Sequence, residues 1–431
     1  MFSDYRVAAF AALILAASAV SAQSLSPAEK KLVQSVEKHL DEESAAFQKV
    51  VDIDSGTLNT IGVQEVGRYF LKELQDLGFQ ARWVSMPDAM KRGGHLVAEH
   101  IAPKSRGKRV LLIGHLDTVF EGKGHRFERA GDLVKGAGVS DMKGGDIVLL
   151  YALKALKDSR LLDDATIRVV LTGDEESPGL PLEVSRRDLR EAAHQSDIAL
   201  SFEPDTGKIA LGRRGLSTWV LQVTGAQGHS AYVLHNGGAG AVYEAARILD
   251  GIRAAFAAHP STTINPGLIL GGTDVSYDAD KSAGTSAGKF NIVAKGATVL
   301  GDVRCLSPKD LEQAKAKILE IASASLPKTS AHISFEDVFL GWPVTEGNRD
   351  ALRFLGVVSK DLGQGPLEAD DPAQRGAGDF GYIGSIVNGA DGLGIRGQGF
   401  HSPEESADLR SLGPSTSRAA VAIARLVRGA Q

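Results

Sequence analysis

The 431-residue sequence predicts an α/β protein with a mostly parallel sheet, into which a smaller α+β domain is inserted. Two observations predict this class. Short apolar runs such as Arg109–Gly114 alternate with helical patterns, which is typical of parallel strands buried on both faces. From about residue 213 the order becomes strand, helix, strand, strand, helix, strand, which is the split βαβ motif of a small one-sheet domain.

The first part of the chain supplies most of the α/β layer. Apolar residues at helical spacing predict helices, and Gly78 ends the second of them. The predicted elements are helices over 26–48, 62–77, 146–157 and 188–194, and strands over 109–114, 167–172 and 198–202.

The inserted domain is expected over residues 213–340 and is called the lid domain below. Its predicted elements are strands over 219–224, 264–270, 297–304 and 331–339, and helices over 239–257 and 308–325. The stretch 271–289 is rich in Gly, Ser and Thr and predicts a mobile loop. The α/β pattern resumes after about residue 341, so the larger domain should comprise residues 23–212 and 341–431.

The N-terminus is typical of a signal peptide. Arg6 precedes a run of small and apolar residues from Val7 to Val20, and a small-x-small pattern ends at Ala22. We therefore expect residues 1–22 to be removed and the mature protein to be exported, either periplasmic or secreted. An uncleaved anchor is the alternative, although a bilayer span needs about 20 apolar residues.

Composition excludes several classes of protein. The net charge of −5 gives no basic excess for a nucleic-acid partner, and no later stretch predicts a membrane span. Cys305 is the only cysteine, which excludes an intramolecular disulfide and predicts a small buried side chain.

Polar side chains follow the carboxyl ends of the predicted strands, where open α/β sheets bind ligands. Two histidines and several carboxylates gathered at one edge are a ligand set for zinc. Four clustered carboxylates would repel one another, and one or two divalent cations would relieve that repulsion. The residues concerned are His115, Asp117, Asp141, Glu175, Glu176, Glu203 and His401.

At these residues the sequence resembles the M20 family of metallopeptidases, especially its glutamate carboxypeptidases and aminoacylases. The resemblance extends over essentially the whole mature chain. Seven motifs in the family's order carry it: Gly114–Val119, Ser140–Gly145, Asp174–Glu176, Ser201–Pro204, Gly228–Ser230, Gly301–Arg304 and Phe400–Ser402.

The resemblance implies a zinc-exopeptidase-like catalytic domain with a ferredoxin-like βαββαβ lid domain, and a possible homodimer through the lid. It implies that one zinc ion binds His115, Asp141 and Glu203. It implies that the other binds Asp141, Glu176 and His401, with Asp141 bridging. Cobalt or manganese would suit the same ligands.

The resemblance also implies roles beyond the metals. Glu175 would be the general base and later the proton donor to the leaving amine. Asp117 would orient His115, and His229 would stabilise the oxyanion. Arg304 would bind the substrate carboxylate, and Asn291 would contact the substrate.

Two departures from the family concern specificity. A hydroxyl residue is common in the family's Gly-rich stretch before Asp379, but this chain has Arg375–Gly378 there. An insertion at 273–288 lengthens a loop near Asn291. Glu rather than Asp at position 203 favours the carboxypeptidase branch.

These observations predict a hydrolase that cleaves an amide bond next to a free carboxylate in a small peptide or N-acyl amino acid. The first alternative is an exported metal- or peptide-binding protein on a degenerate peptidase scaffold. The second is a serine hydrolase using Ser286, whose GxSxG pattern lacks the strand–turn–helix context that a nucleophile requires. Arg304 and His229 could instead be structural, and Arg213 and Arg214 could line a pocket or lie in a solvated hinge.

Overall fold

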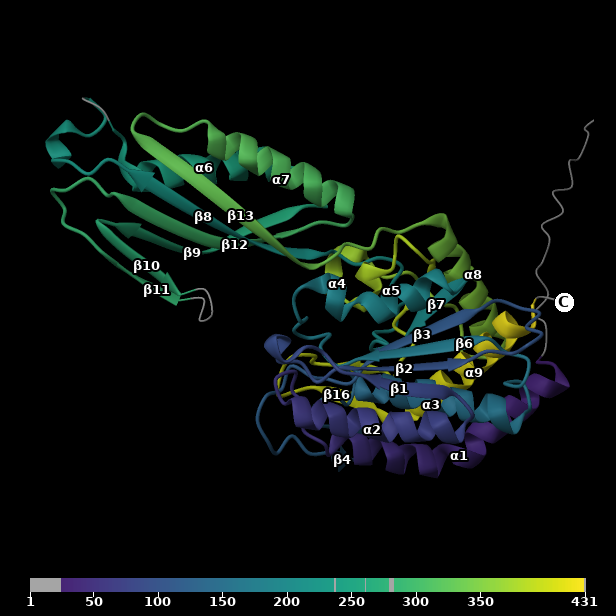
Figure 1. Cartoon of the computed structure of the whole chain (residues 1–431). Coiled ribbons are helices and arrows are strands. Elements are labelled where there is room, and N and C mark those ends of the chain that lie inside the picture. Colours follow the sequence, from purple (N-terminus) through teal and green to yellow (C-terminus); the bar gives the residue numbers. More distant parts are fainter. Residues whose placement is uncertain (1–24, 236–237, 260, 279–282, 430–431) are drawn as a thin grey trace, which may run out of the picture.

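The computed structural model describes residues 25–235, 238–259, 261–278 and 283–429. The predicted signal peptide lies outside these residues. Figure 1 shows a larger α/β body and an elongated lid domain that projects from it through a narrow neck. Among the described residues, no helix combines the length and apolar character needed to cross a bilayer.

The body is built on a six-stranded sheet with the order β1-β2-β6-β3-β7-β14. Strand β3 is parallel to β6 and β7, β14 is parallel to β7, and β1 and β2 run antiparallel at one edge. The predicted mostly parallel sheet is therefore confirmed. The strands are β1 (Gln80–Val84), β2 (His95–His100), β3 (Val110–His115), β6 (Ile167–Thr172), β7 (Ile198–Ser201) and β14 (Gly389–Asp391).

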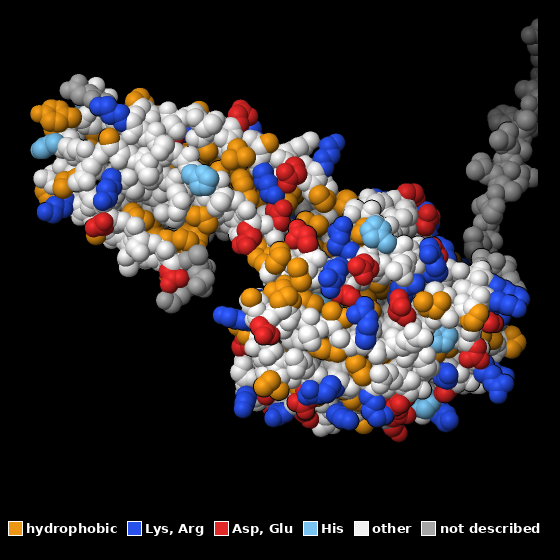
Figure 2. Space-filling model, viewed as in Figure 1, with side chains coloured by type: hydrophobic (Ala, Val, Ile, Leu, Met, Phe, Trp, Pro, Cys, Tyr) orange, Lys and Arg blue, Asp and Glu red, His pale blue; other side chains and the backbone are white. Residues whose placement is uncertain are grey.

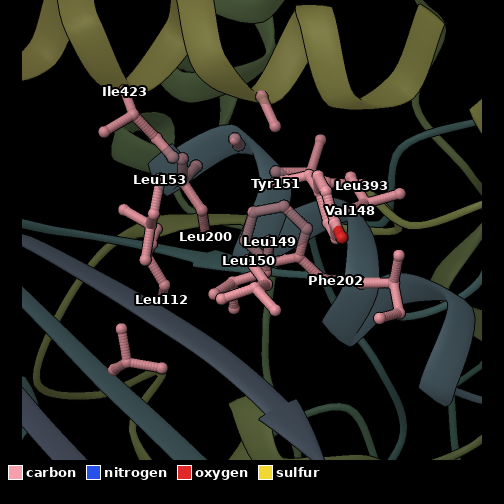
Figure 3. Packing of buried hydrophobic residues seen from close by; sticks show 14 of the residues in the cluster. Leu112, Val148, Leu149, Leu150, Tyr151, Leu153, Leu200, Phe202, Leu393 and Ile423 are labelled. Carbon is pink, nitrogen blue, oxygen red and sulfur yellow. The ribbon is translucent and has the colours of Figure 1, made fainter. Parts of the chain in front are cut away.

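Helices cover the sheet because every residue of its central strands β3, β6 and β7 is buried. Helices α1, α2, α3 and α9 lie on one face, and Figure 3 shows Leu153 of α3 and Ile423 of α9 packed with Leu112 and Leu200 of the sheet. The body helices are α1 (Pro27–Val51), α2 (Thr60–Asp76), α3 (Lys143–Asp158), α4 (Leu182–Ser185), α5 (Arg187–His194), α8 (Glu346–Asp361) and α9 (Leu412–Arg428).

Local sequence explains where the first helix begins. The Ser26 hydroxyl accepts a hydrogen bond from the Glu29 backbone N–H, and the Glu29 carboxylate accepts one from the Ser26 backbone N–H. This capping box satisfies two backbone donors that would otherwise lack partners. The body also carries a small sheet of β4 (Glu128–Ala130), β5 (Leu133–Lys135), β15 (Gly397–Gln398) and β16 (Ser406–Asp408).

The lid domain has a four-stranded antiparallel sheet with the order β13-β8-β12-β9. Its chain order of strand, helix, strand, strand, helix, strand is the predicted one, apart from a hairpin after β9. Trp219, Leu221 and Val299 pack against Ile248 and Ile318 of the helices. The elements are β8 (Leu216–Gly225), α6 (Gly240–Phe256), β9 (Thr263–Gly272), β12 (Gly296–Arg304), α7 (Pro308–Ser323) and β13 (Thr329–Phe339).

The predicted mobile loop over 271–289 is wrong, because most of this stretch forms an antiparallel hairpin of β10 (Asp274–Asp278) and β11 (Ala283–Ala287). Small residues allow the hairpin to pack closely. A Cβ at Gly284 would lie 2.4 Å from Leu270 Cδ1 in β9. The composition that suggested a loop instead lets the hairpin backbone approach the Leu270 side chain of β9 closely.

Candidate metal centre

Each predicted metal ligand lies near the carboxyl edge of the body sheet. His115 is the last residue of β3, Glu175 and Glu176 follow β6, and Glu203 is the second residue after β7. Asp141 lies just before α3, and His401 lies on the turn between β15 and β16. Segments separated by more than 200 residues in the sequence therefore meet at one site.

Asp141 lies between two histidines. Its Oδ1 is 3.3 Å from His115 Nε2, and its Oδ2 is 3.3 Å from His401 Nε2. Glu203 Oε1 is 3.7 Å from His115 Nε2, and Glu176 Oε2 is 3.2 Å from His401 Nε2. The ligand atoms of His115, Asp141 and Glu203 all lie within 4.8 Å of one another, and so do those of Asp141, Glu176 and His401. A third group, formed by His115, Glu175 and Glu176, meets the same limit, and Asp141 belongs to two of the three groups that could hold a cation.

Asp117 fixes both a histidine and the loop after β6. Its carboxylate accepts hydrogen bonds from the backbone N–H groups of Glu175 (3.0 Å) and Glu176 (3.1 Å) and from the Thr57 hydroxyl (2.7 Å). His115 Nδ1 lies 3.0 Å from the Asp117 carbonyl oxygen and 3.5 Å from its Oδ1. These acceptors favour a proton on Nδ1, which leaves Nε2 as the atom that faces Asp141.

The electrostatics of the cluster favour a bound cation. Burial raises the pKa of Glu176 and of Glu203 to about 7 each, and burial with the neighbouring carboxylates raises the pKa of Glu175 well above its ordinary value. Burial also opposes ionisation of Asp141, but hydrogen bonds with His115 and His401 hold its pKa below the usual range. The buried Glu176 Oε1 has no hydrogen-bond partner among the described residues. A buried oxygen without a hydrogen-bond partner, beside carboxylates that repel one another, is an arrangement that a divalent cation would stabilise.

Glu405, which the sequence did not suggest, and Arg213, for which it left a pocket-lining role open, hold the ligands in place. Glu405 accepts hydrogen bonds from the backbone N–H groups of Gly138 (3.1 Å), Ser140 (2.9 Å) and Asp141 (3.0 Å). Arg213 is buried, and its Nη2 lies 3.2 Å from Glu203 Oε2 and 2.6 Å from Asp391 Oδ2. Of the two alternatives for Arg213, the pocket-lining one is confirmed and the solvated hinge is wrong. No local pattern marked Glu405.

The ligands open into a cavity of about 730 Å³ at the junction of the body and the neck of the lid domain. Arg304 lies in its wall, with Nε 3.0 Å from Asp302 Oδ2. Figure 2 shows an open recess between the lid domain and the body on this face.

The structure does not bring His229 or Asn291 to this cavity. Both are exposed and lie side by side, since the Ser230 backbone N–H donates to the Asn291 carbonyl (3.1 Å). They lie beyond the end of β8 that is remote from the neck, whereas Arg304 ends β12 at the neck. The nine residues of β12 (Gly296–Arg304) span roughly 26 Å, so these residues lie at opposite ends of the lid sheet.

The two motifs suggesting other chemistry lack the required context. Ser286 lies on the exposed strand β11, paired with Val275 of β10, and not at a strand–turn–helix. Gly392–Gly397 matches a dinucleotide-binding pattern but leads into β15 without an intervening helix.

Known proteins resemble this chain along most of its length. The model of Peptidase family M20/M25/M40 matches residues 111–425. Carboxypeptidase G2 of Pseudomonas sp. (strain RS-16) is 28% identical over 390 residues, covering 86% of this chain and 87% of that protein. Succinyl-diaminopimelate desuccinylase of Psychrobacter sp. (strain PRwf-1) is 23% identical over 376 residues, covering 84% and 89%.

Solved structures share the fold. Aminopeptidase PepT from Bacillus cereus ATCC 10987 superposes with a TM-score of 0.69 at 18% identity, covering 90% of this chain and 99% of its own. The Bacillus subtilis YXEP protein, described as a dinuclear metal-binding peptidase, gives 0.60 at 14% identity, covering 90% and 98%. Since the family model matches well over half of the sequence, this chain belongs to peptidase family M20/M25/M40 and is a metal-dependent hydrolase.

Proposed function

We propose that this protein is a two-zinc hydrolase that cleaves an amide bond adjacent to a free carboxylate, as a carboxypeptidase or an N-acyl-amino-acid amidohydrolase. One observation carries the proposal. Asp141 lies between His115 and His401 in two adjoining ligand sets, and Glu175, which belongs to neither predicted set, lines the same cavity.

The residues of the two sets have distinct tasks. His115, Asp141 and Glu203 would hold one ion, and Asp141, Glu176 and His401 would hold the other. Bound zinc supplies a nucleophilic water at neutral pH and polarises the substrate carbonyl. Cobalt or manganese fits the same nitrogen and oxygen ligands.

Glu175 lies where it can transfer a proton from the attacking water to the leaving nitrogen. Its backbone N–H donates to Asp117 Oδ1 at 3.0 Å, which fixes the residue beside the ligands. Burial and nearby carboxylates raise its pKa, so its carboxylate accepts a proton readily. We infer that Glu175 takes the proton of the attacking water and then delivers it to the leaving nitrogen. Arg304, in the cavity wall, binds the free carboxylate of the substrate.

A second chain would explain how two distant lid residues could act at one site. His229 and Arg304 lie at opposite ends of one rigid sheet, so closure of a single lid cannot bring both to one pair of metals. We propose a homodimer through the lid domain, in which His229 and Asn291 of one chain reach the cavity of the other. Glu175→Gln chains and His229→Ala chains should each be inactive alone. A mixed dimer of the two should be active, because the His229→Ala chain keeps its own Glu175 and receives His229 from the other chain. Mixed dimers without activity would contradict this arrangement.

We also propose that the mature protein is exported, because residues 1–22 match a signal peptide. Expression of the full sequence in a bacterial host should give a periplasmic or secreted protein whose N-terminal residue is Gln23. A full-length product retained in the cytoplasm would contradict export.

The proposed reaction is tested by measuring hydrolysis of a panel of N-acyl amino acids and C-terminal dipeptides. Each substrate is assayed with untreated protein, with protein treated with a chelator, and with treated protein to which zinc has been added. We expect release of a free amino acid, loss of release with chelator, and recovery with zinc. Absence of hydrolysis across the panel, with two metals bound per chain, would favour the alternative of a metal- or peptide-binding protein.

A further inference from the structure

The loop after β6, residues 173–180, carries Glu175 and Glu176 and lies outside any helix or strand. Within the described part of the chain, no hydrogen bond between two backbone groups supports this loop. Side chains support it instead: its first backbone N–H donates to His95 Nδ1 at 3.0 Å, and two others donate to Asp117. The position of the proposed general base therefore depends on the side chains that hold the loop.

Asp174 holds the loop from within. Its side chain is fully buried, and its Oδ2 accepts a hydrogen bond from the Gly179 backbone N–H at 2.8 Å. Its Oδ1 lies 2.6 Å from Arg186 Nη1, and Arg186 Nη2 donates to the Asp174 carbonyl oxygen at 3.0 Å. Arg186 thus binds both the side chain and the backbone of the residue that directly precedes Glu175.

Arg186, between α4 and α5, also pairs with a distant carboxylate. Only 1% of its side chain is exposed, and its Nε lies 2.9 Å from Asp379 Oδ1 in an ion pair that lacks the alignment of a hydrogen bond. Its guanidinium lies over the Tyr382 ring, 4.9 Å from the centroid. Burial opposes the charge on Arg186, but Asp174 and Asp379 outweigh it and raise its pKa. The guanidinium is therefore charged in the core, where partners on two sides compensate for its burial.

The groups on the far side of Arg186 are themselves fixed. Asp379 Oδ2 accepts a hydrogen bond from the hydroxyl of Thr172, the last residue of β6. The Tyr382 hydroxyl donates to the carbonyl oxygen of Val338 in β13. Arg186 therefore connects the loop to the end of the central sheet and to the last strand of the lid domain.

We propose that Arg186 is a positioning residue for the hydrolysis, which fixes Glu175 where it can exchange protons with the attacking water and the leaving nitrogen. It does so by holding Asp174, the preceding residue, against Asp379. This inference rests on the proposed function and deepens it. A misplacement of about 1 Å at a reacting group can lower a rate about a hundredfold, so a residue that holds Glu175 in place affects turnover without touching the substrate.

The kinetic test uses zinc-loaded protein and the substrate of the panel that it hydrolyses fastest. Arg186→Met should lower kcat about tenfold to a hundredfold and change KM by less than about threefold. Arg186→Lys should recover part of kcat, because an ammonium can pair with one of the two carboxylates. Arg187→Met, at the exposed neighbouring position, should change neither value. A rise in KM with unchanged kcat in Arg186→Met would overturn the proposal.

A double-mutant cycle tests whether Arg186 acts through Glu175. In the Glu175→Gln background, Arg186→Met should lower the small remaining kcat by less than about twofold, because the group that it positions is already absent. Equal factors in the two backgrounds would show that Arg186 acts independently of Glu175. Asp379→Asn keeps the shape of its side chain and leaves the pair of Arg186 and Asp174 intact. It should give the same pattern with a smaller loss, which keeps the test available if Arg186→Met does not fold.

Amide hydrogen exchange separates this inference from the proposed reaction, because it requires no turnover. In Arg186→Met, peptides that cover residues 173–180 should exchange at least about tenfold faster than in the wild type, while those that cover α8 should stay within about twofold. Unchanged exchange in the loop, or equal acceleration throughout the body, would contradict the role of Arg186. Local acceleration in a protein that hydrolyses nothing on the panel would support Arg186 as the residue that holds the loop and refute the reaction.

Discussion

Glu175 is a single carboxylate whose proposed role can be separated from metal binding. Glu175→Gln preserves its shape and backbone contacts but removes the proton acceptor. We expect kcat to fall by about 10²–10⁴ because general base catalysis contributes on that order. Metal content, measured by elemental analysis, should stay at the wild-type value. Glu183→Gln, on the exposed side of α4, is the matched control; substantial activity in Glu175→Gln would refute the assignment.

Glu43 in α1 is buried away from the site, where, among the described residues, only the Thr416 hydroxyl of α9 donates to its carboxylate. Burial raises the pKa of Glu43 to about 8 in the folded protein, against 4.5 ordinarily. The folded state therefore holds this proton more tightly than the unfolded chain. Its contribution to stability is fully present below pH 4.5 and is lost as the pH rises to about 8 and above.

Glu43→Gln should remove this pH dependence. At pH 8.5 the variant should be more stable than the wild type by at least about 1 kcal/mol, since each unit of pKa difference is worth about 1.4 kcal/mol. Urea denaturation of zinc-loaded protein at pH 5 and pH 8.5 measures this, with exposed Glu37→Gln on the same helix as control. Equal pH dependence in Glu43→Gln and wild type would contradict a protonated Glu43.

At the scale of elements, the loop before α3 is organised by a residue from the distant turn that precedes β16. Glu405 binds three backbone N–H groups of this loop and thereby positions Asp141. Glu405→Ala should lower metal affinity about 10- to 100-fold, because loss of a group that orients a ligand typically has that effect. Competition with a zinc-binding dye measures it. The exposed neighbour variant Glu404→Ala should leave the affinity unchanged; equal effects of the two would exclude this role.

For the whole molecule, the metals should contribute to stability because the clustered carboxylates belong to different segments of the body. Free zinc at about a thousand times its Kd adds about 4 kcal/mol for one site. In metal-free protein, burial raises the pKa of Glu176 and Glu203 to about 7, so stability falls as the pH rises from 4.5 through 7.

Chelation should therefore lower Tm, and return of zinc should raise it more at pH 8 than at pH 6. Thermal denaturation at both pH values, with and without chelator, measures the effect. His401→Ala, which lacks one ligand, should recover less. If adding zinc leaves Tm unchanged, the carboxylate and histidine cluster does not bind the metal.

The sequence by itself determined the elements and the candidate chemistry. The strand at 167–172 follows from a short apolar run, and the long first helix follows from apolar residues at helical spacing; both are local properties of the chain. The histidines and carboxylates at strand ends followed from the rule that open α/β sheets bind ligands at that edge. The same local rules failed at 271–289, where a composition rich in Gly, Ser and Thr predicted a loop but the chain forms paired strands.

Only the tertiary structure decided which distant groups meet. Glu405 contacts the Asp141 loop across more than 260 residues, and Arg213 joins Glu203 to Asp391. It also decided that His229 and Arg304 lie at opposite ends of the lid, and that the Arg375 side chain lies in the cavity wall. These contacts depend on how separate segments of the chain pack together, and the spacing of residues along one segment does not predict that packing.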